Sequence, residues 1–261
     1  MKEYGKPKED FQEERERLLN LLDLPENKDI IMRLIGALAF NIRCPNYNYI
    51  QLRMGRVFTD IDFASYSKFT RKIIEFLTAC GYEEDIQVTQ LFGESRLLFH
   101  DFDNERHIDV FLDRLSFSHT IDLRGRLEKD RVTVPLAELF LEKMQIVQIN
   151  EKDLIDTIML LREYDFGNSD ENQINLKIIL KTLSRDWGFW KTVTNNLLTL
   201  KDYVSKAQNL SNEDIEIVNQ RINKILNEIN NSPKSLRWKI RSIFGEKIKW
   251  YQDVEELTDR M

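Results

Sequence analysis

The chain has 261 residues, of which 42% are hydrophobic and 31% are charged, and this predicts a globular protein with one large or two smaller domains. The formal net charge of −6 at pH 7 argues against broad, sequence-independent binding of nucleic acid. No apolar run approaches the length of a membrane span, and the first residues are too polar for a secretory signal, so we expect no membrane partner.

The first predicted elements are a helix, a strand and a second helix. Charged residues alternate with leucines over residues 9–24, which is typical of an amphipathic helix. The apolar run at residues 30–35 is predicted to be a buried strand, and a helix begins after it at Gly36-Ala37. A glycine at such a junction lets a ligand phosphate approach the backbone N–H groups, although the turn by itself also favours glycine.

A polar loop that contains aromatic side chains is expected at residues 44–55. The two cysteines of the chain, Cys44 and Cys80, lack the C-x-x-C spacing of a metal or redox site. This spacing predicts free thiols in a reducing compartment, and therefore a cytoplasmic protein.

Two carboxylates lie one residue apart within residues 57–63, which we expect to form a short strand. Because side chains alternate across a strand, Asp60 and Asp62 are predicted to share one face, while Ile61 and Phe63 face the core. Two like charges this close repel each other, and a hard cation such as Mg²⁺ or Mn²⁺ would relieve the repulsion. The simpler interpretation is a pair of solvated carboxylates at the wet end of a strand.

A helix is predicted at residues 67–79, and three strand-like runs follow it at residues 87–92, 96–100 and 107–112. In the third run Asp109 alternates with the apolar Ile108 and Val110, so it projects to one side together with His107. A third carboxylate on a neighbouring strand is what a two-metal site for phosphoryl transfer requires. The alternative is an acid that protects an edge strand from pairing with another chain.

Further short strands are expected at residues 117–123 and 131–134, and helices at residues 136–148 and 151–163. Lys143 lies on the first of these helices, and Asp153 lies in the first turn of the second. Taken alone, Lys143 is interpreted as a solvated charge and Asp153 as a favourable partner of the helix dipole.

The polar run at residues 166–171 is the clearest linker signal, and only helices are predicted beyond it, at residues 171–183, 186–205, 211–230 and 233–243. Trp187, Phe189 and Trp190 cluster there, which is more typical of helix packing than of stacking on bases. The tail is locally basic, which indicates a solvated face or a surface for RNA or DNA.

Together these elements predict an α+β protein in two parts. The first part, residues 1–165, is expected to hold a mixed β-sheet flanked by helices and to carry the candidate site. The second part, residues 166–261, is expected to be all-helical.

The pattern of the first part resembles the nucleotidyltransferase superfamily, and within it the minimal prokaryotic branch that includes the abortive-infection toxin type of nucleotidyltransferase. That family carries a glycine and a small residue at a helix start, a D-x-D strand and a third acid on a later strand. Here these features are similar to Gly36-Ala37, Asp60-Ile61-Asp62 and Asp109.

The same branch often has a basic residue and a hydroxyl residue just ahead of the acid pair, which Arg56 and Thr59 resemble. It also has a lysine on a helix after the third acid and an acid that opens the next helix, which Lys143 and Asp153 resemble. The resemblance covers residues 28–165 and implies a nucleotidyltransferase-like sheet.

The resemblance implies an enzyme that uses Mg²⁺ or Mn²⁺ to move a nucleoside monophosphate from a nucleoside triphosphate to a hydroxyl of a protein, a small molecule or an RNA. In that mechanism Asp60, Asp62 and Asp109 hold the metal ions, and Asp109 helps deprotonate the acceptor. Gly36 and Ala37 present backbone donors to the phosphates, while basic side chains such as Arg56 and Lys143 neutralise the leaving pyrophosphate.

Two departures from the family pattern stand out. The usual Gly-Ser is Gly36-Ala37 here, which removes a hydroxyl, and the distance along the chain from Gly36 to Asp60 is longer than usual. Two other functions therefore stay open. One is a non-catalytic subunit that binds a partner protein through the C-terminal helices, and the other is a phosphohydrolase that uses water as the acceptor.

Overall fold

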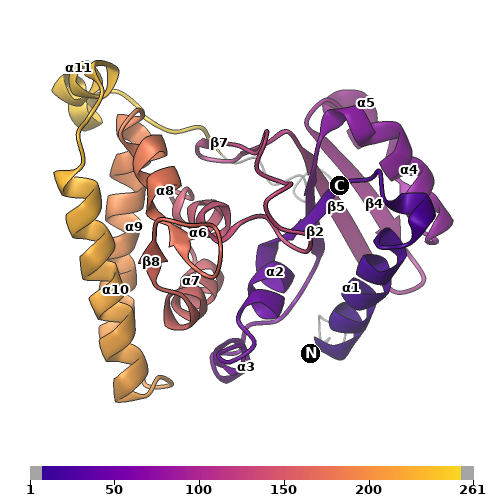
Figure 1. Ribbon diagram of the computed structural model, residues 1–261, viewed down its shortest axis with the longest axis horizontal. Helices are drawn as coiled ribbons and strands as arrows, with labels where there is room; N and C mark the ends of the chain where they lie inside the picture. Colours follow the sequence, from indigo (N-terminus) through magenta and orange to yellow (C-terminus); the bar gives the residue numbers. More distant parts are fainter. Residues whose placement is uncertain (1–7, 254–261) are drawn as a thin grey trace. The chain divides into compact units, whose positions relative to one another are not determined.

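A mixed β-sheet with flanking helices and a bundle of helices form two units of this α+β chain (Figure 1). The computed structural model describes residues 8–253. The first unit runs to Leu115 and takes in Asp122–Pro135, and the second comprises Ser116–Ile121 and the described residues from Leu136 onward. The predicted lack of a secretory signal falls on residues 1–7, which lie outside the described residues.

The sheet of the first unit has five strands, in the order β1 (Met32–Ile35), β2 (Ile61–Ser65), β5 (Arg106–Leu112), β4 (Arg96–Asp101) and β3 (Glu83–Glu84). β2 and β5 are parallel, and the other neighbours in the sheet are antiparallel. These strand directions make the sheet mixed, as the sequence predicts. The central strands carry fully buried side chains on one face, among them Phe63, Val110 and Phe99.

Five α-helices accompany this sheet among the described residues: α1 (Lys8–Leu22), α2 (Gly36–Arg43), α3 (Tyr49–Arg53), α4 (Thr70–Ala79) and α5 (Ile86–Phe92). Short 3₁₀ turns precede β1 and α4, at η1 (Pro25–Asn27) and η2 (Ser67–Phe69). α2 packs against β1 and β2, while α5 packs against β4. α1 buries Leu18 completely, as expected of an amphipathic helix.

Several local predictions for the first unit are wrong. The expected strand at residues 87–92 is helix α5, because Asp85 caps its first turn by accepting a hydrogen bond from the N–H of Val88 at 2.9 Å. The expected loop at residues 44–55 contains α3. The expected strand at residues 131–134 is reduced to an isolated bridge between Leu34 and Thr133.

A two-stranded hairpin, β6 (Arg114–Ser116) and β7 (Thr120–Asp122), is divided between the units, because Ser116–Ile121 belongs to the second unit and the residues on either side belong to the first. The single strand predicted at residues 117–123 is therefore replaced by the turn and second strand of this hairpin. Ser116 and Thr120 face each other across it, with their hydroxyl oxygens 3.3 Å apart.

The second unit contains six α-helices in its described part: α6 (Leu136–Met144), α7 (Glu151–Glu163), α8 (Leu176–Leu183), α9 (Trp187–Lys206), α10 (Asn212–Asn231) and α11 (Leu236–Phe244). A small parallel ladder joins β8 (Phe166–Gly167) to β9 (Ile174–Asn175), and η3 (Gly245–Lys247) follows α11. No helix within residues 8–253 is both long and apolar enough to cross a membrane.

The boundary between the units differs from the division predicted after residue 165. α6 and α7 pack against α8, α9 and α10, and so they belong to the second unit. A buried ion pair joins α7 to α10, with Nε of Arg162 2.7 Å from Oδ1 of Asp214. Residues 166–171, which the sequence predicts to be a linker, do not separate two folded parts, because Phe166 and Gly167 form β8 of the β8–β9 ladder.

Candidate functional site

Asp62 and Asp109 lie side by side on one face of the sheet. β2 and β5 are parallel, and their register pairs Asp62 with Asp109. Register partners on neighbouring strands point to the same face, so the two carboxylates are adjacent. Asp109 is 5% exposed, which means that its charge depends on the groups around it in the protein. The structure thus brings together two of the three predicted acids.

Gly36 meets this pair at the start of α2. It has a φ of +67°, a left-handed conformation that favours glycine, and it directly follows β1. A β-carbon at this position would lie 2.2 Å from Oδ2 of Asp62, which is too close for any side chain. Only glycine therefore allows the N-terminal end of α2, with its partial positive charge, to approach the Asp62 carboxylate.

Asp60 lies just before β2, which begins at Ile61, so the prediction of a strand at residues 57–63 is wrong in its boundaries. Its Oδ2 is 4.0 Å from Nε2 of His107 on β5. His107 is two residues from Asp109 and therefore projects to the same face of the sheet. Asp60 thus reaches the face that holds Asp62 and Asp109. We call these three residues the acidic face.

Arg96, which the sequence analysis did not single out, forms an ion pair with Asp109. Its Nε lies 2.5 Å from Oδ1 of Asp109, and its guanidinium also lies 5.5 Å from the ring centroid of Phe111. β4 is antiparallel to β5, with Leu98 opposite Asp109 and Arg96 opposite Phe111. The alternation of side chains along β4 therefore carries Arg96 to the acidic face, a placement that sequence reasoning finds only once the register is known.

The acidic face has the donor chemistry of a hard divalent cation, since carboxylate oxygens are the ligands that Mg²⁺ and Mn²⁺ prefer. In the described part of the chain, no three His, Cys, Asp or Glu side chains are grouped so as to hold a metal ion together. The positive charge beside Asp109 in this structure comes from Arg96. The residues present fit a cation through Asp62 and Asp109, and a third ligand requires rearrangement of Asp60.

The residues predicted to support the acid pair lie in different surroundings. Arg56 is buried, and its guanidinium donates a hydrogen bond to the carbonyl of Val57. Thr59 is exposed beside Asp60. Ala37 is buried in the first turn of α2, where its carbonyl accepts a hydrogen bond from Nε2 of Gln51 at 3.3 Å. Arg56 and Ala37 are thus both buried and hydrogen-bonded to other groups of the protein in this structure.

Lys143 and Asp153 belong to the second unit, where they form an ion pair with 3.4 Å between Nζ and Oδ1. Lys143 also lies 3.2 Å from Glu142 and 3.7 Å from Asp156. Only 8% of Lys143 is exposed, so the interpretation of this lysine as a solvated charge is wrong. Asn150 caps α7 by accepting a hydrogen bond from the N–H of Asp153 at 3.0 Å.

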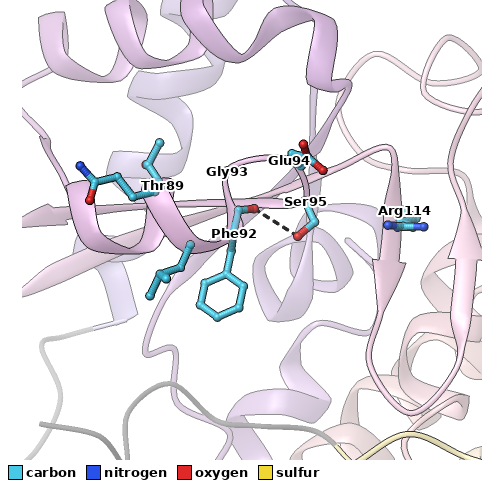
Figure 2. A pocket seen from close by; sticks show the side chains of 8 residues that line it. Thr89, Phe92, Gly93, Glu94, Ser95 and Arg114 are labelled. Atoms are coloured by element: carbon cyan, nitrogen blue, oxygen red, sulfur yellow. Dashed lines mark hydrogen bonds between the residues drawn. The ribbon is translucent and has the colours of Figure 1, made fainter.

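An open pocket of about 470 Å³ lies at the C-terminal end of α5 (Figure 2). Its lining runs from Thr89 to Ser95 and includes Arg114. The hydroxyl of Ser95 donates a hydrogen bond to the carbonyl of Phe92 at 3.1 Å, which closes the turn after the helix (Figure 2). None of the three acids of the acidic face lines this pocket, so the pocket and the candidate site are separate features of the described chain.

No protein-family model matches the chain, and no curated protein and no solved structure is significantly similar to it. The candidate site therefore stands on its own geometry.

Proposed function

We propose that the acidic face belongs to a metal-dependent nucleotidyltransferase that moves a nucleoside monophosphate from a nucleoside triphosphate to an acceptor hydroxyl. The observation that carries the proposal is the meeting of Gly36, Asp62 and Asp109. Asp62 and Asp109 are register partners on parallel strands, and Gly36 is in contact with the Asp62 carboxylate at a helix start. This arrangement joins acidic ligands to backbone that a phosphate can approach.

A cation at this face would be held by Asp62 and Asp109, with Asp60 as the third ligand. When bound, Mg²⁺ or Mn²⁺ supplies the positive charge that neutralises the phosphates of the nucleotide. The ion pair between Asp109 and Arg96 must break before Asp109 takes part, because the metal ion and the Arg96 guanidinium compete for the same carboxylate.

The chain's own residues then have defined tasks in the proposed reaction. The acceptor oxygen bonds to the α-phosphorus as the bond to pyrophosphate breaks, and the proton of the hydroxyl passes to Asp109. Gly36 lets the Asp62 carboxylate lie close to the first turn of α2, whose N–H groups donate hydrogen bonds to a phosphate oxygen. Arg96, released from Asp109, neutralises charge on the departing pyrophosphate.

The alternative is a non-catalytic subunit with the same architecture that acts by binding a partner protein. The Arg96–Asp109 ion pair favours this alternative, because the guanidinium already neutralises the buried carboxylate at the place where a metal ion would bind. It also agrees with Ala37, which lacks the hydroxyl of the family's usual serine.

One experiment separates the two functions. The purified full-length protein is incubated with Mn²⁺ and each labelled nucleoside triphosphate, with protein, total RNA and small hydroxyl compounds as acceptors. Transfer predicts label in one acceptor class together with released pyrophosphate. Asp60→Asn and Asp62→Asn should abolish this transfer, since each removes a negative charge and keeps the size of the side chain.

Asp103→Asn is the matched control, because Asp103 is an exposed aspartate in the turn between β4 and β5. Unchanged transfer in Asp62→Asn would remove the acidic face from the mechanism. Free monophosphate or phosphate without incorporation would indicate hydrolysis. The absence of both turnover and metal-dependent nucleotide binding would support the non-catalytic subunit.

A further inference from the structure

α11 presents an apolar stripe to solvent. Leu236, Ile240 and Ile243 recur at positions i, i+4 and i+7 and therefore lie on one face of this nine-residue helix. They are 73%, 52% and 79% exposed, and the neighbouring Phe244 is 49% exposed. We call these four residues the α11 stripe. Exposed aliphatic side chains that are contiguous on one face mark a surface that binds something.

The opposite side of α11 holds the helix on its unit. The ring of Trp238 lies 5.1 Å from the ring of Trp190 on α9, at an angle of 75°. The guanidinium of Arg241 lies 4.7 Å from the ring centroid of Trp187 and donates hydrogen bonds to the carbonyls of Gly245 and Ile248. The outward orientation of the α11 stripe is therefore fixed by packing, and the stripe remains exposed within the described chain.

Unpaired cations flank the α11 stripe. On a helical projection Lys239 lies on one side of the stripe and Arg237 on the other, and Lys247 follows in η3. All three are exposed, and none forms an ion pair with any part of residues 8–253. Between residues 231 and 252 the sequence holds one acid, Glu246, which is paired with Lys191 at 2.6 Å, and the next, Asp253, is paired with Lys249 at 2.5 Å. Within the described chain, the unpaired charge that α11 and η3 place beside the stripe is therefore positive on both sides.

This pattern selects among possible occupants. A second copy of α11 would bring like charges together on both flanks, which opposes self-association. Nucleic acid would satisfy the cations and stack on Phe244, but it would leave Leu236, Ile240 and Ile243 in water, since bases stack on aromatic or guanidinium planes. An anionic lipid surface satisfies both features, because its acyl region accepts the stripe and its headgroups accept the cations.

We propose that α11 docks the protein on the surface of an anionic lipid bilayer, which revises the expectation from the sequence that the protein has no membrane partner. The helix lies in the plane of the interface, with the α11 stripe at the boundary of the acyl chains and Arg237, Lys239 and Lys247 among the phosphates. The helix is too short to span the bilayer and binds only its surface. This inference is independent of the acidic face, because it uses no residue of that site.

The test is flotation of the full-length protein with two kinds of vesicle, phosphatidylcholine alone and equal parts of phosphatidylcholine and phosphatidylserine. We expect binding to the anionic vesicles that weakens as salt rises. Arg237→Gln with Lys239→Gln should weaken binding by roughly thirtyfold, at about 1 kcal/mol for each cation. Ile240→Asp with Ile243→Asp should weaken it by roughly tenfold or more.

Leu91→Asp is the matched control, since Leu91 is 76% exposed on α5 and lies outside the proposed surface. It should leave vesicle binding unchanged, and circular dichroism should show that every variant is folded. Absence of binding to the anionic vesicles, or equal binding to the neutral ones, overturns the proposal. A dimer that Ile243→Asp dissociates, without vesicle binding, also overturns it and identifies the stripe as a contact between copies.

Discussion

Gly36 lies so close to Asp62 that a β-carbon on the glycine would stand 2.2 Å from the carboxylate oxygen Oδ2. The contact ties the first residue of α2 to the second residue of β2, although 25 residues lie between them along the chain. This close approach gives the most direct test of the geometry of the candidate site.

Gly36→Ala should lower the free energy of unfolding by roughly 2–4 kcal/mol. The left-handed backbone contributes about 1 kcal/mol of this cost, and the clash with Asp62 contributes the rest. Chemical denaturation measures the change. Gly55→Ala is the control, because Gly55 has a similar φ of +72° and nothing within 4 Å of its β-carbon position. Equal costs for the two substitutions would contradict the close contact.

Arg96→Met should destabilise the first unit by roughly 3 kcal/mol, because it leaves the buried Asp109 carboxylate without its cation. Adding Asp109→Asn should restore much of that loss, since the double variant no longer buries a lone charge. Thermal unfolding of the two single variants and the double variant measures this coupling. If the effects of the two substitutions were additive, the interaction free energy between Arg96 and Asp109 would be close to zero.

Mn²⁺ should stabilise Arg96→Met more than it stabilises the unchanged protein. In the variant Asp109 is free to bind a cation together with Asp62, and binding to the folded state raises the midpoint of unfolding. The increase in midpoint with rising Mn²⁺ concentration is the measurement. Arg71→Met, which removes a 91% exposed arginine from α4, should show the same response as the unchanged protein. If the unfolding midpoint of Arg96→Met did not change with Mn²⁺ concentration, this would argue against a cation site at the acidic face.

The second unit should lose stability as the pH falls from about 6.5 toward 4, because of His119. Its ring is buried, stacks on Phe189 at 4.7 Å and lies 2.8 Å from the hydroxyl of Thr192. Burial lowers the pKa of His119 from 6.5 to about 4, against the opposing effect of Asp186. The unfolded imidazole therefore binds a proton that the folded one does not, and each pH unit in this window costs about 1.4 kcal/mol.

Denaturation of the unchanged protein and of His119→Gln at several pH values isolates this contribution. Above about pH 7.5 the difference between the two proteins should be constant, because the imidazole is neutral there in both the folded and the unfolded protein. Below it, the unchanged protein should lose stability more steeply. Parallel profiles across the whole range would show that folding leaves the pKa of His119 unchanged.

Asp85→Ala should destabilise α5 by about 1 kcal/mol, which is the usual cost of losing an N-cap. Oδ1 of Asp85 accepts the hydrogen bond of Val88, and Oδ2 lies 3.3 Å from Nε2 of His100. Asp85→Asn should retain most of the stability, because an amide oxygen caps a helix almost as well. Hydrogen exchange of the amides at residues 86–92 locates the effect. If these amides were as well protected in Asp85→Ala as in the unchanged protein, the prediction would be wrong.

The same capping residue explains where the sequence prediction failed. Val88, Thr89 and Phe92 favour a strand, and a window of six residues is too short to distinguish the two periods. The hydrogen bond from Val88 to Asp85 and the packing of α5 on β4 decide in favour of the helix. Asp85 is the signal that a search for caps at each polar run would have found.

For the candidate site, alternation along a single strand was predictable and pairing between strands was not. The sequence places Asp109 and His107 on one side of β5, because that depends only on neighbours in the chain. The pairing of Asp62 with Asp109, and the reach of Arg96 across β4, depend on register between segments far apart in sequence. The position of Arg96 beside Asp109 therefore becomes known only from the tertiary structure.

The short piece Ser116–Ile121 belongs to the second unit although both of its flanks belong to the first. Within the second unit its His119 stacks on Phe189, and the carbonyl of Ser118 accepts a hydrogen bond from the N–H of Gln252. If the protein were cut between Pro135 and Leu136, Ser116–Ile121 would remain on the N-terminal fragment, separated from the unit to which it belongs. Efforts to dissect the chain into self-sufficient halves should therefore fail at that position, and any transplanted helical half would have to carry its six-residue insert with it.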